Sequence, residues 1–335
     1  MAASIERLRS YLDSIGEGVQ IEPLTADAST REYFRIPWNA STAVACIYPA
    51  PFSSDENTYL DTTSLFLSAD LPVAEIYAVS EEHGIIIQED LGDRILRTEL
   101  GNSDEGRRDR LRKEAISLIA RIQLATQRAF STGSVASTLR FDKEKLLWEL
   151  DFFKQHYFET YLGKSLSSET GTALSQEFSF LAATLEGYAG VLCHRDFHAA
   201  NLMLDANDKM RIIDHQDARI GSAAYDLVSL LLDRITEPPP PEWLAAQRKY
   251  FLTVRRTLGL PKIDEADFAY EFRLQTLQRC LKAVGTFSYQ SAVRGKTYFI
   301  PFIKPMFRIV LRSAGNVEGF VTLKEILSNE VEREN

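Results

Sequence analysis

The segment VLCHRDFHAANLMLDANDKMRIIDHQDARIGSAAYDLVSLL, residues 191–231, decides how this 335-residue chain is interpreted. It contains the tripeptide His-Arg-Asp at 194–196, then Asn201 after four intervening residues, and Asp214 thirteen positions beyond Asn201. Short apolar runs separate these polar residues, so we predict strands joined by loops that present the polar side chains. This segment is where we expect the chemistry of the protein.

The spacing matches the catalytic loop of kinases, followed by a second aspartate that binds metal. Phosphoryl transfer needs a carboxylate that orients the acceptor hydroxyl and takes its proton, and oxygen ligands that hold Mg²⁺ against the phosphates. We assign the catalytic role to Asp196 and the metal-ligand role to Asn201 and Asp214. The alternative is a buried turn in which these side chains only cap backbone groups. The match of all the elements together favours phosphoryl transfer, with ATP and Mg²⁺ as cofactors.

The segment resembles the aminoglycoside phosphotransferase and choline kinase superfamily, which shares the loop His-x-Asp-x4-Asn and replaces Asp-Phe-Gly, here by Asp-His-Gln at 214–216. The stretches 27–36, 85–93, 213–234 and 277–287 are further similar to bacterial anomeric N-acetylmuramate and N-acetylglucosamine kinases. The resemblance covers most of the chain. It implies a protein-kinase-like fold and an ATP-dependent enzyme of cell-wall recycling that phosphorylates a sugar, with the anomeric hydroxyl as the expected acceptor.

The remaining residues of the segment receive supporting roles. In the family the loop histidine packs and hydrogen-bonds, so the resemblance implies that His194 is structural, and we expect Asp226 to brace the loop or cap a helix. A zinc site formed by the histidines at 194, 198 and 215 is rejected because the cluster lacks thiolates. The candidate substrate contacts are Arg195, His198, Asp217 and Arg234.

The patterns before and after this segment predict two lobes. Between residues 21 and 88, short runs rich in aromatic and β-branched residues alternate with polar turns, and a helix is expected at about 53–69 with Ser53 and Ser54 as its cap. From about residue 93 the apolar positions recur at helical spacing. The fold class we predict is α+β, a two-lobed protein-kinase-like fold with a small β-rich N-terminal lobe and a larger helical C-terminal lobe.

The boundary between the two lobes is expected at a hinge formed by residues 88–92. Residues 1–92 are the predicted nucleotide-binding lobe, and residues 93–335 are the predicted helical lobe with the catalytic loop and the substrate site. The stretch GIIIQEDLGD at 84–93 resembles a kinase hinge, whose backbone groups would meet adenine. A β-hairpin edge followed by a turn at Gly92 would look the same.

The small lobe lacks two features of a standard kinase. The expected phosphate loop, TADASTR at 25–31, contains no glycine, and the expected third strand, AVACIYP at 43–49, contains no lysine. Hydroxyl and backbone N–H groups could hold phosphate oxygens instead, and an arginine could supply the positive charge. The arginines could equally be ordinary solvated surface. The candidate cofactor-binding residues are Ser29, Thr30, Arg31, Arg35, Glu89 and Leu91.

The charge of the chain is unevenly distributed. The net charge is −9, yet residues 1–112 alone hold 20 acidic residues, 10 arginines and no lysine, while the rest of the chain is nearly balanced at +1. This pattern argues against a general nucleic-acid partner. Aminoglycosides are polycations, so a nearly neutral substrate lobe favours a neutral or anionic small molecule, and a sugar is the partner we expect.

The cysteines and the apolar runs indicate the compartment. The three cysteines are far apart, without metal-ligand spacing, which fits a reducing cytosol. No apolar run approaches the roughly 18 residues of a membrane span, and the N-terminal stretch lacks the core of a secretory signal. We therefore expect a cytoplasmic protein without a membrane partner. The sequence does not indicate an oligomeric state.

Two other functions remain open at this point. One is a different small-molecule kinase of the same superfamily, acting on an aminoglycoside or an amino alcohol. The other, of a different class, is a catalytically inactive nucleotide-binding scaffold, which would explain the missing lysine and glycines. The presence of Asp196, Asn201 and Asp214 argues against the scaffold.

Overall fold

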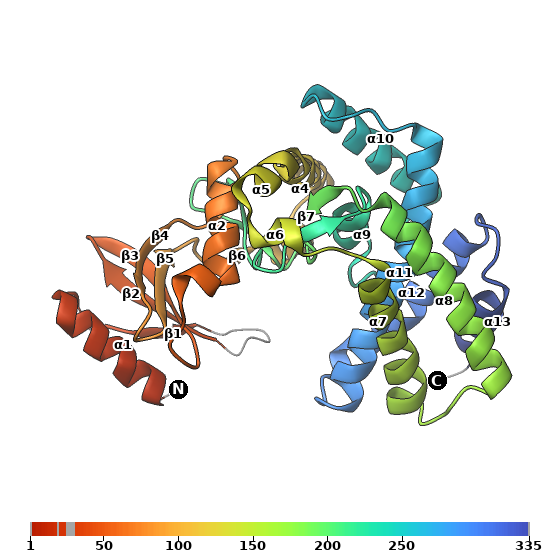
Figure 1. The fold of residues 1–335 in the computed structure, drawn as a ribbon, viewed down its shortest axis with the longest axis horizontal. Coiled ribbons are helices and arrows are strands. Elements are labelled where there is room, and N and C mark those ends of the chain that lie inside the picture. The colour runs from red at the N-terminus through yellow and green to blue at the C-terminus, as the bar shows by residue number, and fades with distance from the viewer. Residues whose placement is uncertain (1, 19, 25–30, 334–335) are drawn as a thin grey trace. The chain divides into compact units, whose positions relative to one another are not determined.

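The computed structural model describes residues 2–18, 20–24 and 31–333. The chain divides into two compact units (Figure 1): unit 1 comprises residues 1–102 and 200–217, and unit 2 comprises residues 103–199 and 218–335. The segment 200–217 therefore packs with the N-terminal part of the chain, although the predicted catalytic loop begins in unit 2 at residue 194. The expected hinge at 88–92 lies inside unit 1.

Unit 1 is built on an antiparallel five-stranded sheet with the strand order β1-β2-β3-β5-β4. Phe34 pairs with Ala45, and Ala45 pairs with Ile87, so every second residue of the three central strands lies on one face. The strands predicted from the sequence are present, with ends shifted by at most two residues. Their bounds are β1 (Glu22–Leu24), β2 (Glu32–Trp38), β3 (Ser41–Ile47), β4 (Ile76–Ser80) and β5 (Ile85–Glu89).

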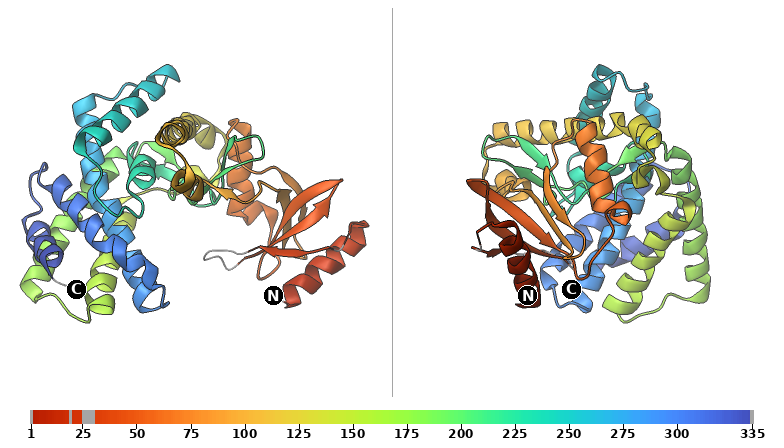
Figure 2. Two further views of the ribbon diagram at one scale, coloured as in Figure 1. Left: turned by 180° about the vertical axis from the view of Figure 1, so that it is seen from behind. Right: turned by 60° about the vertical axis from the view of Figure 1, so that its left-hand side comes forward.

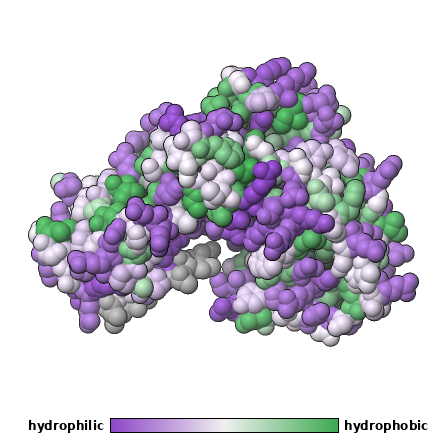
Figure 3. Space-filling view, viewed as in Figure 1, coloured by the Kyte–Doolittle hydropathy of each residue, from purple (hydrophilic) through white to green (hydrophobic). Residues whose placement is uncertain are grey.

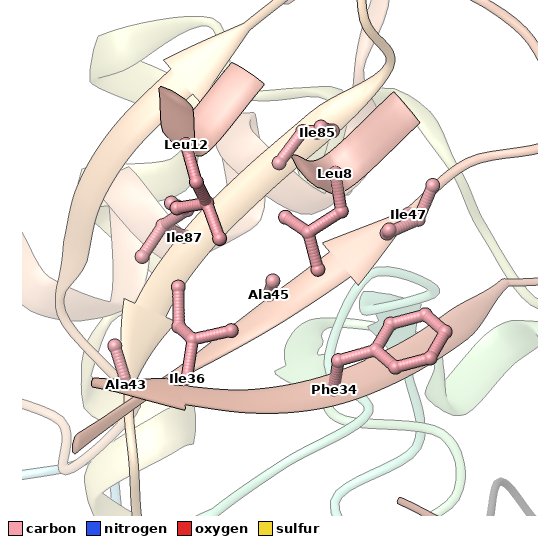
Figure 4. Packing of buried hydrophobic residues seen from close by; sticks show 9 residues of the cluster. All are labelled: Leu8, Leu12, Phe34, Ile36, Ala43, Ala45, Ile47, Ile85 and Ile87. Atoms are coloured by element: carbon pink, nitrogen blue, oxygen red, sulfur yellow. The ribbon is translucent and has the colours of Figure 1, made fainter. Parts of the chain in front are cut away.

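The two faces of this sheet differ in chemistry. One face is covered by α1 (Ala2–Ile15), whose Leu8 and Leu12 pack on an apolar layer drawn in Figure 4. The other face carries Cys46 and several tyrosines and is covered by α2 (Thr58–Ser68) (Figure 2). On this face β3, the strand on which a kinase would carry its lysine, presents Cys46.

Helix α2 begins later than predicted. Residues Ser54–Glu56 form a single turn of 3₁₀ helix, and Ser53 makes no side-chain cap bond. The Asn57 side chain instead accepts hydrogen bonds from the backbone N–H groups of Tyr59 (3.0 Å) and Leu60 (3.2 Å). The predicted cap at Ser53 and Ser54 is wrong, because asparagine, an equally good N-cap residue, satisfies the helix donors one turn further on.

A three-stranded sheet completes unit 1. It consists of β6 (Arg94–Ile95), β8 (Leu202–Leu204) and β9 (Met210–Ile212). Helix α3 (Leu96–Asn102) follows β6 directly in the chain. Met203 pairs with Arg211, so β8 and β9 form a hairpin. The residues predicted to bind metal lie at the open end of this hairpin, where the Ile213 N–H donates to the carbonyl of Asn201 (3.1 Å).

Unit 2 is mainly helical, as predicted, with one two-stranded sheet of β7 (Val191–Cys193) and β10 (Arg219–Gly221). Its longest element is the 28-residue α11 (Glu265–Ala292), which packs against most of its neighbours. The other elements are α4 (Glu105–Leu124), α5 (Thr126–Thr132), α6 (Val135–Thr138), α7 (Lys143–Phe153), the π-helix η2 (Lys154–Tyr161), α8 (Ser168–Tyr188), α9 (Tyr225–Leu232), α10 (Pro241–Thr257), the 3₁₀ helix η3 (Thr297–Phe302), α12 (Ile303–Ala314) and α13 (Val321–Glu332).

A glycine permits the close packing of α11 on α7. A Cβ atom added at Gly285 would lie 2.7 Å from the Cα atom of Phe153, so no other residue fits there without a shift of the helices. In the described part of the chain, no helix is both long enough and apolar enough to span a membrane. On the face seen in Figure 3, hydrophilic residues are interspersed with smaller hydrophobic patches over both units.

Candidate active site

A buried carboxylate holds the loop that follows β7 in unit 2. The backbone N–H groups of His194 and Arg195 donate to the two oxygens of Asp226, at 2.7 and 3.0 Å. Asp226 is fully buried in the first turn of α9, and the His194 ring packs edge-on against Phe197. Arg195 has a φ of 83°, a left-handed conformation that is unfavourable for a residue with a Cβ. The Asp226 carboxylate thus holds the strained backbone in place.

The burial of Asp226 changes its ionisation. Burial raises the pKa of its carboxyl group to about 7, even though the two N–H donors act in the opposite direction. The nearby Asp196 carboxylate also raises this pKa. The residue that anchors the loop therefore titrates near neutral pH.

Asp196 lies among three positive charges. Arg279 Nη2 and Lys282 Nζ, both from α11, are each 3.3 Å from its Oδ1 atom, and Arg195 Nε is 3.7 Å from its Oδ2 atom. Burial by itself would raise the pKa of Asp196, but Lys282 and Arg279 outweigh it and hold that pKa well below its usual range. Asp196 is therefore ionised at neutral pH and is a weak base. Such a carboxylate is better suited to orient an acceptor hydroxyl group than to remove the proton of that hydroxyl early in a reaction.

Sequence reasoning did not find Arg279 and Lys282. The available signal was a set of polar residues among the apolar positions of α11. Gln275, Gln278 and Arg279 are all buried on α11, and buried polar side chains are usually engaged with one another or with a site.

The two residues predicted to bind metal are adjacent within unit 1. Asn201 Nδ2 donates to Asp214 Oδ2 (3.2 Å), and Gln216 Nε2 donates to Asp214 Oδ1 (2.7 Å). Asp214 is exposed and has a φ of 62°, so its backbone is strained like that of Arg195. The carboxylate of Asp214 and the amide oxygen of Asn201 are hard ligands of the kind that Mg²⁺ prefers.

No richer metal site exists in the part of the chain that the structure describes, where no three His, Cys, Asp or Glu side chains are grouped to hold an ion. Magnesium keeps several waters and binds nucleotide oxygens, so it needs few protein ligands. His215, beside Asp214, is buried, and its Nε2 atom is 2.7 Å from Thr63 Oγ1. Because the Thr63 hydroxyl donates to the Tyr59 carbonyl (2.6 Å), His215 is the donor in this bond. Its ring also packs against Phe66, which connects the loop predicted to bind metal to α2.

The charge of Arg35 is matched at the expected hinge. Its Nε and Nη2 atoms lie 2.6 and 3.1 Å from the two oxygens of Asp90, and Nη2 lies 2.9 Å from Asp93 Oδ1. Burial would raise the pKa of Asp90, but Arg35 and the Gly92 N–H hold it below its usual range. Two carboxylates therefore neutralise Arg35, which leaves little charge for a phosphate.

The other hinge residues are also engaged. The Glu89 carboxylate pairs with Arg211, at 2.8 Å between Oε1 and Nη1, and Arg211 further donates to the carbonyl of Val73 (2.9 Å). The Leu91 side chain is buried. These contacts connect β5 to β9 within unit 1. Contact of Glu89 and Leu91 with a nucleotide remains a prediction.

Arg31 faces an open pocket of about 470 Å³ in unit 1. Its guanidinium carbon lies 5.9, 5.6 and 5.9 Å from the ring centres of Tyr33, Tyr48 and Tyr59. Asn57 also lines this pocket. Of the predicted cofactor-binding residues, Ser29 and Thr30 lie outside the described residues.

The candidate substrate contacts belong to both units. His198 follows Asp196 closely in unit 2, where its N–H donates to the Asp196 carbonyl (2.9 Å) and its imidazole, like Arg195, lowers the pKa of Asp196. Arg234, also in unit 2, lies over the Phe299 ring at 4.9 Å. Asp217 belongs to unit 1.

Comparison with known proteins places the chain in a family. Residues 20–263 match the phosphotransferase enzyme family. The chain is 28% identical over 311 residues to the N-acetylmuramate/N-acetylglucosamine kinase of Neisseria meningitidis, covering 91% of this chain and 90% of that protein. It is 27% identical over 341 residues to the protein of the same name from Pseudomonas aeruginosa, covering 98% and 97%.

Solved structures confirm the predicted fold class. An ADP-bound aminoglycoside phosphotransferase, APH(2'')-Ib, aligns with a TM-score of 0.55 at 15% identity and covers 91% of this chain and 97% of that protein. The choline kinase LicA of Streptococcus pneumoniae aligns with a TM-score of 0.56 at 12% identity, covering 92% and 98%. At such identities the likeness concerns the fold alone.

Proposed function

Because this chain belongs to the phosphotransferase enzyme family, we propose that it is an ATP- and Mg²⁺-dependent sugar kinase that phosphorylates the anomeric hydroxyl of N-acetylmuramate, N-acetylglucosamine or both. The observation that carries the proposal is the environment of Asp196, an ionised carboxylate surrounded by cations on a loop held by Asp226. The names of the two relatives support an amino sugar as the acceptor. The use of ATP and the three free, buried cysteines fit a cytoplasmic enzyme of cell-wall recycling.

In the proposed reaction, Asp196 accepts a hydrogen bond from the sugar hydroxyl and directs a lone pair of its oxygen toward the γ-phosphorus of ATP. The new O–P bond forms as the bond between that phosphorus and the bridging oxygen of ADP breaks. The proton of the hydroxyl passes to Asp196 late in the step, because a carboxylate of low pKa is a weak base. Asn201 and Asp214 would hold Mg²⁺, which neutralises phosphate charge when bound.

The positive charge that a kinase lysine would supply is assigned to Arg31 in this proposal. Arg31 faces the pocket beside Tyr33, Tyr48 and Tyr59. Arg35, in contrast, is neutralised by Asp90 and Asp93. A guanidinium binds phosphate oxygens in a planar, two-point geometry that a lysine lacks. The hydroxyl groups of Ser29 and Thr30 and the backbone at Glu89 and Leu91 complete the proposed nucleotide contacts.

The cations around Asp196 also bear on the competing acceptors. An aminoglycoside or a choline-like amine would bring positive charge beside Lys282, Arg279 and Arg195 and would be repelled. A neutral or acidic sugar meets no such repulsion. The sugar is therefore favoured over the aminoglycoside and the amino alcohol.

The test is an assay of ADP release with MgATP and each acceptor in turn: N-acetylmuramate, N-acetylglucosamine, an aminoglycoside and choline. We expect turnover of the sugars and an acid-labile product whose phosphorus NMR signal is that of an anomeric phosphate. Asp196→Asn should abolish turnover and leave ATP binding, measured by calorimetry, within about twofold. Turnover of the aminoglycoside alone, or of no acceptor, refutes the sugar-kinase proposal, and phosphate on another hydroxyl refutes the anomeric position.

A further inference from the structure

We propose that Lys282, together with Arg279, recognises an acidic group on the acceptor, so that an acceptor bearing a carboxylate is preferred to its neutral counterpart. This inference rests on the proposed function, because it concerns the acceptor of the same reaction. N-acetylmuramate differs from N-acetylglucosamine by a lactyl ether on O3, which carries a carboxylate.

The first argument is the charge beside the reacting group. Arg279 and Lys282 converge on the same oxygen of Asp196, each at 3.3 Å, and Arg195 approaches the other oxygen at 3.7 Å. Three cations thus make ion pairs with one carboxylate. Glu149 and Asp233 add negative charge near Arg279, and Glu149 also acts on Lys282. Because Lys282 and Arg279 share a single oxygen of Asp196, each keeps N–H donors for a second anion.

The second argument separates Lys282 from Arg279. Arg279 is anchored, because its Nε–H donates to Ser229 Oγ (2.8 Å) and its guanidinium lies over the Tyr225 ring (6.0 Å). The Lys282 ammonium has three donors, and its one side-chain hydrogen bond within the described residues goes to Asp196. That bond, at 3.3 Å, is longer than charge-assisted hydrogen bonds of about 2.7–2.9 Å usually are.

Lys282 is also placed to reach a ligand. Its side chain is 14% exposed, against 9% for Arg279. Burial and the Arg279 charge lower the pKa of Lys282, so an additional anion would stabilise its charged form. The flexible four-carbon stem of a lysine allows the ammonium to turn from Asp196 toward a neighbouring carboxylate without loss of the first contact.

The third argument is the geometry of the sugar. The anomeric hydroxyl must reach Asp196 for the reaction, and C3 is separated from C1 by a single ring atom. A carboxylate on O3 can therefore reach a cation that lies on the same side of Asp196 as C3. The same face of α11 continues two turns on with the half-buried Tyr289, which packs against Phe152 of α7 (6.1 Å) and offers an aromatic surface for the ring.

The experiment compares kcat/KM for the two sugars in three proteins: wild type, Lys282→Met and Lys249→Met. Methionine keeps the length of the side chain and removes its charge, and Lys249 is a matched control because it is exposed on α10 of the same unit. We expect Lys282→Met to lower the ratio of kcat/KM for N-acetylmuramate to that for N-acetylglucosamine by on the order of ten- to a hundredfold. The control should leave the ratio unchanged.

A second measurement needs no variant and covers the case in which Lys282→Met does not fold. With the wild-type enzyme, the methyl ester of N-acetylmuramate keeps the shape of the substrate and loses its charge. We expect kcat/KM for the ester to fall on the order of ten- to a hundredfold below that for the acid.

The outcomes separate this inference from the proposed function. An equal loss for both sugars in Lys282→Met would mean that the ammonium acts on Asp196 or on the transferring phosphoryl group, and would overturn the inference while the kinase stands. An ester as good as the acid, or a wild type that prefers N-acetylglucosamine, would overturn it as well. Turnover of neither sugar would instead refute the proposed function.

Discussion

The removal of the Asp226 carboxylate should destabilise unit 2 because two backbone donors would lose their acceptor. In Asp226→Ala the N–H groups of His194 and Arg195 are left unpaired at a site that is fully buried on the His194 side. Each unpaired buried donor costs about 1–3 kcal/mol, so the free energy of unfolding should fall by about 2–6 kcal/mol. Burial of the Asp226 carboxylate, whose pKa is raised to about 7, itself destabilises the folded wild type, and the alanine variant lacks this cost. The loss of unfolding free energy should therefore lie in the lower part of that range.

The matched control is Asp264→Ala. Asp264 also accepts hydrogen bonds from two consecutive backbone N–H groups, those of Ala266 (2.8 Å) and Asp267 (3.3 Å), but it is exposed at the start of α11. Water can replace its carboxylate, so the loss should be about 1 kcal/mol. Asp226→Asn keeps one acceptor oxygen and should fall between the two.

The assay is equilibrium unfolding in urea, followed by tryptophan fluorescence, together with kcat for the sugar. We expect a lower midpoint for Asp226→Ala than for Asp264→Ala at an unchanged slope, and a loss of kcat in Asp226→Ala alone. If the two alanine variants unfold at the same urea concentration, Asp226 does not anchor the loop and the reasoning is refuted.

Three further predictions concern ionisation, nucleotide binding and packing. The pKa of Asp226 is about 7 in the folded protein and about 4 in the unfolded chain, so the stabilisation from its protonation is fully present below about pH 4 and is lost as the pH rises through about 7. The free energy of unfolding of the wild type minus that of Asp226→Asn should therefore be larger at about pH 5 than at about pH 8. A difference independent of pH would contradict the shift. Arg31→Met should weaken ATP binding, measured by calorimetry, about tenfold. Arg35→Met should change it by no more than about twofold, because Asp90 and Asp93 already neutralise the charge of Arg35. Equal effects of the two substitutions would show that the pocket at Arg31 is not the phosphate site. Gly285→Ala should lower the free energy of unfolding by about 1–3 kcal/mol, because its Cβ atom would lie 2.7 Å from the Phe153 Cα atom. An unchanged melting curve would mean that α7 and α11 move apart at little cost in free energy.

Much of the architecture could be predicted because its signals are local. The alternation that places Phe34, Ala45 and Ile87 on one face repeats every second residue, so β2, β3 and β5 could be recognised from short runs. The ends of elements were predicted less accurately, as at Asn57. Several neighbouring residues could cap the same helix, and the backbone conformation in the folded protein selects one of them.

The candidate site was predictable in part. The residues of the predicted catalytic loop and of the predicted metal site lie within a short stretch, from Asp196 to Asp214, where spacing along the chain carries the information. Arg31 and Arg35 could not be distinguished from each other, since both lie on one short stretch. Their difference comes from Asp90, which lies 55 residues from Arg35 in the chain and pairs with it across the sheet.

The amino-acid sequence by itself determined which groups could perform the chemistry: a carboxylate, an amide and a second carboxylate at the spacing of a phosphoryl-transfer loop. Only the tertiary structure decided the state of those groups. Arg279 and Lys282 lie 83 and 86 residues beyond Asp196, and they reach it because α11 packs against α9, whose Asp226 holds the loop. The spacing of residues along the chain can be read from the sequence. The interaction energy between charges depends instead on their distance and burial in the folded protein, which only folding establishes.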